Sequence, residues 1–351
     1  MDIELLSKTV IPLVSWFEKN ARQMPWRQEP TPYHTWISEI MLQQTRVDAV
    51  IPYYQRFLQE LPDVGALAKA PEEQLLKLWE GLGYYNRVRN LQKAARVIVE
   101  ELDGEIPSSY EQLLKLPGIG AYTAGAIASI AFGQAVPAVD GNVLRVVMRV
   151  TASQDDIGEE KVKEKVRSAL KGIYPAGKEG QFTESLMELG AVVCLPNGAP
   201  KCSECPLGTI CLAHQRGIEQ SLPVKQPKKQ RRIEKRTVYL LFYDNKVAIR
   251  KRPEKGLLSG LWEFPSKEGW DTLKEAGQQI REWELTARSV KKSIAAKHIF
   301  SHIEWHMKGI AVECAKQNNG FEWVTPQQLR QEYALPSALD AYQKEAYKAK
   351  E

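Results

Sequence analysis

The chain has 351 residues, 43% of them hydrophobic and 26% charged, and this mixture excludes disordered, collagen-like and coiled-coil proteins. No apolar run approaches the ~20 residues that cross a bilayer, and the N-terminal MDIELLSKTV lacks the basic start of a secretory signal peptide. We therefore expect a cytoplasmic protein with no membrane segment and, at roughly 100–200 residues per domain, two or three domains. The net charge of +5 does not by itself identify a polyanionic partner.

Residues 1–222 are expected to form a helical region, because apolar side chains recur at helical spacing between short Pro and Gly breaks. One such stripe runs through residues 33–47 and another through residues 143–150. Residues 121–132 are small and apolar, which favours a buried helix. The pattern predicts an all-α fold for this region.

The composition changes near residue 222, where a basic segment begins. Residues 225–236, KQPKKQRRIEKR, carry seven basic residues and one acidic residue, so the rest of the chain is close to neutral. The segment contains a Pro and has no apolar period. We therefore expect an exposed linker over residues 223–236, with charges that suit contact with phosphates.

Residues 237–351 are expected to form a small α+β domain. Two β-rich runs flank the turn Asp244-Asn245, which is typical of a hairpin. The expected strands are 237–243, 246–251 and 305–314, and the expected helices are 271–285 and 337–348. The fold class predicted for the whole chain is multidomain, an all-α region followed by an α+β domain.

Four cysteines crowd into 18 residues with the spacing C-x7-C-x2-C-x5-C, and they are Cys194, Cys202, Cys205 and Cys211. In a reducing compartment such a group indicates a metal centre rather than disulfides. Zinc and a [4Fe-4S] cluster both accept four thiolates, but structural zinc sites usually have two C-x2-C pairs and this chain has one, which favours the [4Fe-4S] cluster. The spacing leaves open whether the cluster has a redox or a structural role. Cys314 stands apart and is expected to be a core thiol.

A glycine-rich turn, Leu116-Pro117-Gly118-Ile119-Gly120, joins two predicted helices. Free N–H groups and the helix dipole at the start of the second helix would favour an anion such as a phosphate. Twenty residues later comes Asp140, for which the local pattern favours the simple role of a helix N-cap.

The order of these motifs resembles the endonuclease III-like helix-hairpin-helix superfamily of base-excision DNA glycosylases. The members that the chain resembles most are the MutY-type adenine DNA glycosylases, through Pro25-Trp26-Arg27, SEIMLQQT over 38–45, GLGYY over 81–85 and PAVDGN over 137–142. The resemblance covers residues 12–215 and continues more faintly over 237–345. It implies an enzyme of DNA repair that excises adenine mispaired with 8-oxoguanine or guanine.

The resemblance also assigns the chemistry. Glu39 would be a protonated acid that gives a proton to N7 of adenine, which requires a pKa raised by an apolar pocket. Asp140 would stabilise or attack the oxocarbenium-like sugar, Tyr122 would hydrogen-bond Asp140, and Asn142 would support the transition state or the water. On a continuous helix Glu39 would share a face with Leu42, Gln43 and Arg46, and without the resemblance a solvated face is favoured. Bifunctional relatives carry a Schiff-base lysine at the position of Tyr122, so a monofunctional enzyme is implied.

Contacts with extruded adenine and with DNA are implied by the same match. The implied adenine pocket consists of Trp26, Arg27, Leu42 and Glu184. The implied DNA-binding residues are Gln44, Thr45, Leu82, Tyr84, Gly118 and Gly120, with Gln44 and Tyr84 as wedges in the base stack. Core packing is the plain alternative for Trp26, and an exposed helix position is the plain alternative for Glu184.

Residues 237–351 resemble the Nudix-like domain of the same family. The segment Arg281-Glu282-Trp283-Glu284-Leu285 has only half of the acidic helix of a Nudix hydrolase, so nucleotide hydrolysis is not expected. The resemblance implies 8-oxoguanine recognition by Phe300, Ser301 and His302, although His302 fits an ordinary turn position equally well.

The chain departs from the family in its first cysteine gap, which is x7 instead of the usual x6. The loop between Cys194 and Cys202 is often basic in relatives and here offers only Lys201, which puts a DNA contact by this loop in doubt. The expected partner is double-stranded DNA bound by a monomer associated with the nucleoid. Two alternatives stay open, a bifunctional glycosylase/lyase for oxidised pyrimidines and an iron–sulfur DNA-binding or redox module without glycosylase activity.

Overall fold

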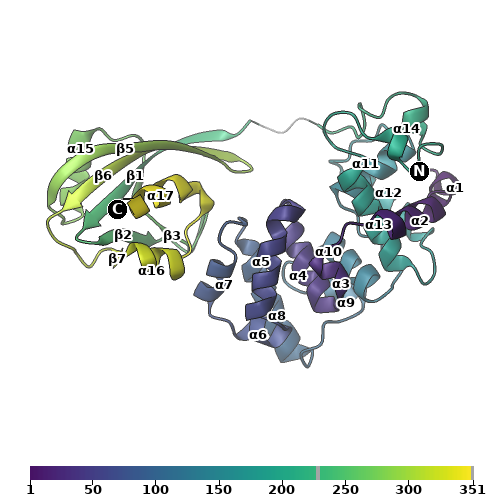
Figure 1. Cartoon of the computed structure of the whole chain (residues 1–351), viewed down its shortest axis with the longest axis horizontal. Coiled ribbons are helices and arrows are strands. Elements are labelled where there is room, and N and C mark those ends of the chain that lie inside the picture. Colours follow the sequence, from purple (N-terminus) through teal and green to yellow (C-terminus); the bar gives the residue numbers. More distant parts are fainter. Residues whose placement is uncertain (227–229, 349–351) are drawn as a thin grey trace. The chain divides into compact units, whose positions relative to one another are not determined.

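A computed structural model of the chain describes residues 1–226 and 230–348 (Figure 1). Residues 227–229 of the predicted linker and 349–351 of the predicted C-terminal domain lie outside the described residues. The chain divides into two compact units. The helical unit comprises Met1–Lys69 and Arg89–Pro227, and the sheet unit comprises Ala70–Val88 and Lys228–Glu351.

The helical unit confirms the all-α prediction. Its helices are α1 Ile3–Ser7, α2 Val10–Asn20, α3 Pro25–Gln28, α4 Pro32–Leu42, α5 Val47–Glu60, α6 Val64–Lys69, most of α8 Asn86–Glu101, α9 Tyr110–Leu113, α10 Ala121–Ala126, α11 Gly141–Val150, α12 Glu160–Lys171, α13 Glu179–Val192 and α14 Leu212–Gln215. A π-helical turn, η1 Ile127–Ala131, continues α10, and a 3₁₀ turn, η2 Cys202–Glu204, lies among the cysteines. π-helical turns of this kind often occur at functional sites.

One hydrophobic core joins α1, α2, α11, α12 and α13. Helix α11 lies at its centre, because the apolar residues of VLRVVMRV are buried around the whole helix. A helix that is buried on all sides must be enclosed by neighbours. This core therefore fixes the N-terminus of α11, where Asp140 is located.

Helix α4 places Glu39 in the interior and then stops. Thr31 caps its N-terminus, Pro32 occupies the first turn, and the chain leaves helical geometry at Gln43. Gln44 follows with a φ of 59°, a left-handed conformation that is uncommon outside glycine. The predicted helix face shared by Glu39, Gln43 and Arg46 is therefore wrong, because only Glu39 of these three lies within the helix.

The sheet unit is built on strands in the order β3-β2-β1-β6-β5, with β4 paired to β1 and β7 to β2. The strands are β1 Arg232–Tyr243, β2 Lys246–Lys251, β3 Trp262–Glu263, β4 Ser266–Glu268, β5 Ala287–Ile299, β6 Ile303–Cys314 and β7 Glu322–Val324. Its helices are α7 Glu72–Leu78, α15 Leu273–Glu282, α16 Pro326–Gln331 and α17 Asp340–Lys348, with a 3₁₀ turn η3 Ser337–Leu339. The predicted β1–β2 hairpin is confirmed.

Strand β1 begins inside the segment that was expected to be a linker. Arg232 pairs with Ile303, and the parallel ladder between β1 and β6 continues to Phe242 opposite Glu313. Side chains alternate along β1, so Val238 and Leu240 pack with α16 and α17 on one face. Tyr239 and Leu241 pack with α15 on the other (Figure 1).

The segment Ala70–Val88 belongs to the sheet unit, although the rest of that unit lies much later in the chain. Lys77 Nζ donates to the Tyr333 carbonyl at 3.0 Å, and Leu335 N donates to Glu80 Oε1 at 2.9 Å. Lys77 and Glu80 also form an ion pair at 2.6 Å. Among the described helices, none has the length and apolar character needed to span a membrane.

Candidate active site and metal centre

A cavity of 520 Å³ opens in the helical unit where the ends of α4, α10 and α11 meet α12. Its lining includes Leu42 from the end of α4, Tyr122 from the first turn of α10, and Asp140 just before α11. Three residues that are distant in sequence, and that were all predicted for one site, therefore lie around one cavity.

Glu39 is 6% exposed and contacts the wall of this cavity through Tyr122. Its Oε2 accepts a hydrogen bond from the Tyr122 hydroxyl. Burial raises the pKa of Glu39 to about 7, the Tyr122 hydrogen bond opposes this rise, and the nearby charge of Asp140 adds to it. The expected Tyr122–Asp140 hydrogen bond is thus replaced by one to Glu39, because α4 brings the glutamate to the tyrosine.

Asp140 has a different environment from Glu39. It is the N-cap of α11, with Oδ1 accepting from Val143 N at 2.7 Å, and its Oδ2 accepts from Asn142 Nδ2 at 2.8 Å. Burial raises the pKa of Asp140, while these hydrogen bonds and the charge of Arg145 hold it down. Val143 and Asn142 thus donate to the ionised form of Asp140, whereas the Glu39 carboxyl accepts from the Tyr122 hydroxyl.

Further hydrogen bonds connect Asn142, the partner of Asp140, to Cys194 through Arg145. Arg145 Nη2 donates to Asn142 Oδ1 at 2.8 Å and to the Gly190 carbonyl at 2.7 Å, and its Nε donates to the Cys194 carbonyl at 2.7 Å. A Cβ on Gly190 would lie 2.5 Å from the Asn142 Cβ. The close approach of α13 to α11 at this point therefore requires glycine.

Arg145 and Arg149 of α11 were not predicted as site residues. Both are buried, at 6% and 3% exposure, and Arg149 Nη1 donates to Cys194 Sγ at 3.1 Å. A signal for them exists in the sequence, because two arginines four residues apart interrupt an otherwise apolar helix. Such buried cations need partners.

The residues predicted for the adenine pocket do not all line the cavity. Leu42 lines the cavity, whereas Trp26 is buried and makes an edge contact with Tyr54 at 5.3 Å between ring centroids. Arg27 Nε donates to Glu184 Oε1 at 2.7 Å, so Glu184 is half-buried and ion-paired rather than an exposed helix residue. Burial raises the pKa of Glu184, and Arg27 opposes the rise.

A second acid, Glu188, stabilises this pair and was not predicted. Its carboxylate accepts hydrogen bonds from Arg22 Nε at 2.6 Å and from Arg27 Nη2 at 3.1 Å. Burial would raise the pKa of Glu188, but the two arginines lower it below its ordinary value. Glu188 therefore stays charged and orients Arg27.

The predicted DNA-contact residues differ in exposure. Gln44 is exposed and lines the cavity, and Tyr84 is 48% exposed with a φ of 50°. Strained backbone at exposed residues is common at functional sites. Leu82 is only 7% exposed, and Thr45 Oγ1 donates to the Gln43 carbonyl at 3.4 Å.

The glycine-rich turn has the geometry expected of an anion-binding hairpin. Gly118 has a φ of 75°, and a Cβ there would lie 2.6 Å from the Asn90 Cβ, so glycine is required. Gly120 is the N-cap of α10, and a Cβ on it would meet nothing within 4 Å. The backbone at Gly120 is therefore open on the side where a side chain would lie.

Phe300, Ser301 and His302 form the turn between β5 and β6 in the sheet unit. Phe300 packs on Trp305, with ring centroids 5.0 Å apart, while Ser301 and His302 are exposed. The Ser301 hydroxyl lies 2.9 Å from the Tyr84 hydroxyl. The predicted wedge and the predicted recognition turn thus share a hydrogen bond inside the sheet unit.

The four predicted metal ligands line one small pocket with Arg149, and they are Cys194, Cys202, Cys205 and Cys211. All are free thiols. Burial raises the pKa of Cys205 to about 12, and the other three thiols add to this rise. Four such thiols are costly to ionise together without a cation, so the donor set fits a thiolate-bound metal centre.

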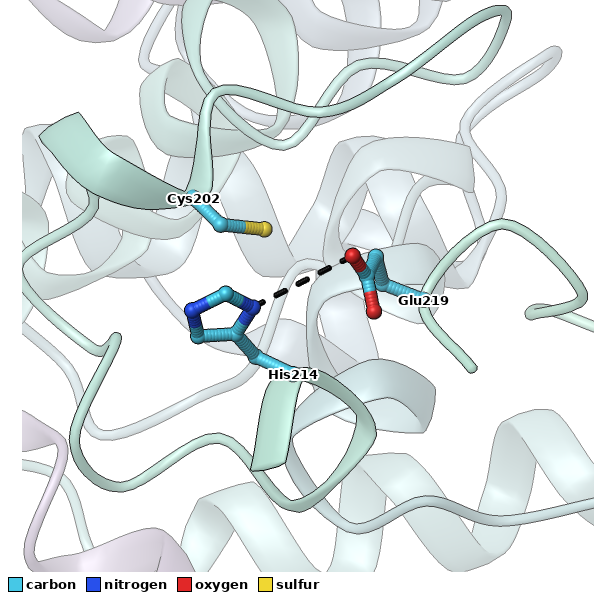
Figure 2. A group of neighbouring side chains, drawn as sticks. All are labelled: Cys202, His214 and Glu219. Carbon is cyan, nitrogen blue, oxygen red and sulfur yellow. Dashed lines mark ion pairs between the residues drawn. The ribbon is translucent and has the colours of Figure 1, made fainter. Parts of the chain in front are cut away.

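A further group of possible ligands lies beside Cys202. Its sulfur, the His214 ring and the Glu219 carboxylate have ligand atoms within 4.8 Å of one another. His214 Nδ1 and Glu219 Oε1 form an ion pair at 3.9 Å (Figure 2). This mixed set shares Cys202 with the four-thiol set, so one ion or cluster would use one set or the other. The [4Fe-4S] centre favours four sulfurs.

Two family models match the chain. Residues 37–171 match the HhH-GPD superfamily base excision DNA repair protein, and residues 237–344 match the NUDIX domain. These ranges contain the cavity of the helical unit and the turn between β5 and β6.

Curated relatives and solved structures extend the match. The chain is 34% identical to the adenine DNA glycosylase of Buchnera aphidicola (Schizaphis graminum), over 86% of both chains. It is 35% identical to that of Homo sapiens, over 86% of this chain and 66% of the human protein. A thermostable thymine-DNA glycosylase matches 61% of this chain and 98% of its own, with 27% identity and a TM-score of 0.56. An endonuclease III–DNA complex, at 23% identity and a TM-score of 0.53, supports the helical fold.

Proposed function

The chain belongs to the adenine DNA glycosylases, within a superfamily of base excision DNA repair proteins, and from this premise we propose that it excises adenine opposite 8-oxoguanine or guanine. The bond broken is the N-glycosidic bond, and the DNA strand is left intact. The observation that carries the proposal is a pair of carboxyl groups. Asp140 lines the cavity and is held by N–H donors, and Glu39, with a pKa near 7, is hydrogen-bonded to Tyr122 of the cavity wall.

Glu39 supplies the proton that lets adenine leave as a neutral base. A carboxyl group with a pKa near 7 is protonated in a large fraction of molecules at neutral pH, and it can donate within the reaction. Tyr122 positions it through their hydrogen bond. N7 of the extruded adenine is the acceptor that fits this role.

Asp140 supplies the negative charge that the sugar needs as the base departs. Its hydrogen bonds from Val143 and Asn142 fix the carboxylate at the cavity wall. A preorganised charge of this kind stabilises an oxocarbenium-like transition state without reorganisation. Asn142, held by Arg145, keeps Asp140 oriented.

The proposal of a monofunctional enzyme is supported by the chemistry of Tyr122, which cannot form a Schiff base. The bifunctional alternative has one observation in its favour, because Lys163 also lines the cavity. Lys163 Nζ forms an ion pair with Glu160 at 2.7 Å. An ammonium group in an ion pair has no free electron pair for attack, so hydrolysis is favoured.

Gln44 and Tyr84 enter the base stack when adenine is extruded, and the turn of Gly118 and Gly120 holds a backbone phosphate. The turn that contains Ser301 recognises the base opposite adenine. The chain acts as a monomer on double-stranded DNA.

A [4Fe-4S] cluster is the centre that we propose for the four thiols. When bound, it supplies covalent cross-links between η2, the preceding loop and α14. Arg149 donates to the sulfur of Cys194, and Arg145 holds the Cys194 carbonyl. These two residues orient the first ligand from α11.

A single-turnover assay tests the function. A duplex with A opposite 8-oxoguanine should release free adenine, and Glu39→Gln and Asp140→Asn should each abolish release while duplex binding remains. Glu160→Gln is the matched control, since Glu160 lines the same cavity but is fully exposed and ion-paired. Absence of free adenine from the unmodified chain would contradict the proposal.

The bifunctional alternative is tested on the same duplex with borohydride. We expect no covalent adduct, and a trapped adduct that disappears in Lys163→Gln would establish the lyase instead. A chain that is brown but releases no base would favour the iron–sulfur DNA-binding module.

A further inference from the structure

Part of the sheet face on which α15 packs is exposed. Helix α15 shares a hydrophobic core with Tyr239 of β1 and with Ile310 and Val312 of β6. It lies near one end of the sheet, and β5 and β6 extend beyond it (Figure 1). We call the part of this face between α15 and the β5–β6 turn the exposed face, and its principal residues are Ile233, Lys235, Trp270, Lys297, Ile299 and Lys308.

Two isoleucines on neighbouring strands give the exposed face its apolar surface. Ile233 of β1 and Ile299 of β5 both pair with Glu304 of β6, and the two isoleucines are 58% and 52% exposed. Ile233 precedes Tyr239 by six positions, so both side chains point to the same side of the sheet. Covering this pair would remove apolar surface from water, which favours association.

The adjoining rows of the exposed face carry lysines. Lys235 of β1 and Lys297 of β5 both pair with His306 of β6, and Lys308 follows His306 by two positions on the same side of that strand. All three lysines are exposed. The apolar pair is therefore bordered by positive charge.

The carboxylates nearby do not neutralise this charge. Glu304 is 14% exposed and forms an ion pair with Lys297, and Asp271 is 9% exposed and pairs with Lys267 at 3.7 Å. In the part of the chain that the structure describes, Lys235 and Lys308 have no carboxylate partner, and each contacts the ring of Trp270 instead. These two ammonium groups remain available to an anionic partner.

Trp270 holds the two lysines at defined positions. Its ring centroid lies 4.7 Å from Lys235 Nζ and 4.0 Å from Lys308 Nζ, and such contacts stabilise a cation. The indole N–H donates to the His306 carbonyl at 3.1 Å, which fixes the ring although Trp270 is 40% exposed. Groups that are held in place before binding lose less entropy when a partner arrives.

We propose that the exposed face binds an acidic segment of a partner protein that also carries apolar side chains. The two unpaired lysines are complementary to carboxylates of this segment, and Ile233, Ile299 and Trp270 are complementary to its apolar side chains. DNA phosphates would satisfy the lysines but not the isoleucines. The site goes beyond base excision, because it uses neither Glu39 nor Asp140.

Fluorescence anisotropy with the full chain and labelled peptides tests the proposal. The probe is a short peptide in which Glu alternates with Leu, and the comparison peptides replace every Leu by Ser or every Glu by Lys. The Glu–Leu peptide should bind at least about tenfold more tightly than the Glu–Ser and Lys–Leu peptides, since it alone offers both carboxylates and apolar side chains.

Two substitutions separate the charge from the apolar surface. Lys308→Glu should weaken binding of the Glu–Leu peptide at least about tenfold and strengthen binding of the Lys–Leu peptide, because the charge is reversed. Ile299→Ser should weaken the Glu–Leu peptide by about fivefold and leave the Glu–Ser peptide unchanged. Both side chains are exposed, so we expect both variants to fold, which circular dichroism checks.

Lys291→Glu is the matched control. Lys291 is also an exposed lysine of β5, but it pairs with Ala311, next to Ile310. It therefore points to the side of the sheet opposite the exposed face. This variant should bind the Glu–Leu peptide as the unmodified chain does.

Three results would overturn the proposal. The first is no binding of the Glu–Leu peptide at about 1 mM, or equal binding by the unmodified chain, Lys308→Glu and Ile299→Ser. The second is a loss of duplex DNA binding in Lys308→Glu without preference for the Glu–Leu peptide, which would assign the face to nucleic acid. The third is a dimer in sedimentation that Ile299→Ser dissociates, which would assign it to a second copy. No measurement involves release of adenine, so failure here is distinguishable from failure of the proposed glycosylase activity.

Discussion

The two units each contain an open cavity of 520 Å³, and the ionisable groups around them differ in kind. In the helical unit the buried groups are carboxyls, and burial moves the pKa of Glu39 to about 7. In the sheet unit they are arginines, which keep their charge even when buried. The comparison teaches that burial creates a proton donor from an acid but leaves an arginine with a fixed positive charge.

The largest effect is expected at the charged member of the carboxyl pair. Asp140→Asn keeps the cap of α11 but removes the negative charge, so the excision rate should fall by at least about 1,000-fold, near 4 kcal/mol of transition-state stabilisation. Single-turnover kinetics measure it, with circular dichroism as the control for folding. A rate within tenfold of the unmodified chain would remove Asp140 from the mechanism.

The next effect concerns the metal centre, which belongs to the helical unit alone. Cys205→Ala should abolish absorbance near 400 nm and lower stability by several kcal/mol, because metal-binding energy contributes to folding. Cys314→Ala is the matched control, since this buried thiol lies in the sheet core. Zinc in place of iron, found by metal analysis, would contradict the [4Fe-4S] assignment.

A pH-dependent effect is expected for the buried acid. The folded pKa of Glu39 is raised from 4.5 to about 7, so its contribution to stability is fully present below pH 4.5 and is lost as pH rises through 7. Glu39→Gln should therefore be more stable than the unmodified chain at pH 8–9, by up to about 3 kcal/mol. The difference should vanish near pH 4, and denaturant unfolding at both pH values measures it.

A smaller loss of stability is expected where α13 approaches α11. Gly190→Ala places a methyl group 2.5 Å from the Asn142 Cβ, and such overpacking costs about 1–3 kcal/mol. Excision should also slow, since Asn142 orients Asp140. Gly120→Ala is the control, because a Cβ there meets open space; equal melting temperatures for the two variants would refute the close packing.

The smallest effect is a shift in the pH profile. The Tyr122 hydrogen bond lowers the pKa of Glu39, against the larger effect of burial. Tyr122→Phe should raise that pKa further and move the alkaline limb of the excision profile upward, by up to about one pH unit. Movement toward lower pH would show that the tyrosine hydroxyl does not stabilise the Glu39 carboxylate.

The sequence was sufficient for the features encoded by local pattern. Cysteine spacing predicted the four thiols that share a pocket, and apolar periodicity predicted the helical region and the β1–β2 hairpin. Asp140 was recognised both as a cap and as a candidate acid, and the structure contains the cap. These features depend on residues close together in the chain.

What the sequence could not show depends on distant partners. Tyr122 donates to Glu39 across 83 positions rather than to Asp140, and no local pattern encodes that choice. Strand β1 begins at Arg232 because β6 pairs with it, although its first residues have the composition of a linker. The cavity lined by Arg232 and Arg236 was missed for the same reason, since both residues lie in the segment expected to be a linker.

The packing of residues Ala70–Val88 has a practical consequence for dissecting this protein. The polypeptide enters the sheet unit, returns to the helical unit, and enters the sheet unit again after residue 227. A truncation before Arg232 would remove Tyr333 and Leu335, the hydrogen-bond partners of Lys77 and Glu80. A loss of activity in the truncated chain would have two causes, the missing C-terminal residues and the disturbed Ala70–Val88 segment that remains. Point substitutions in the sheet unit therefore measure its contribution more cleanly.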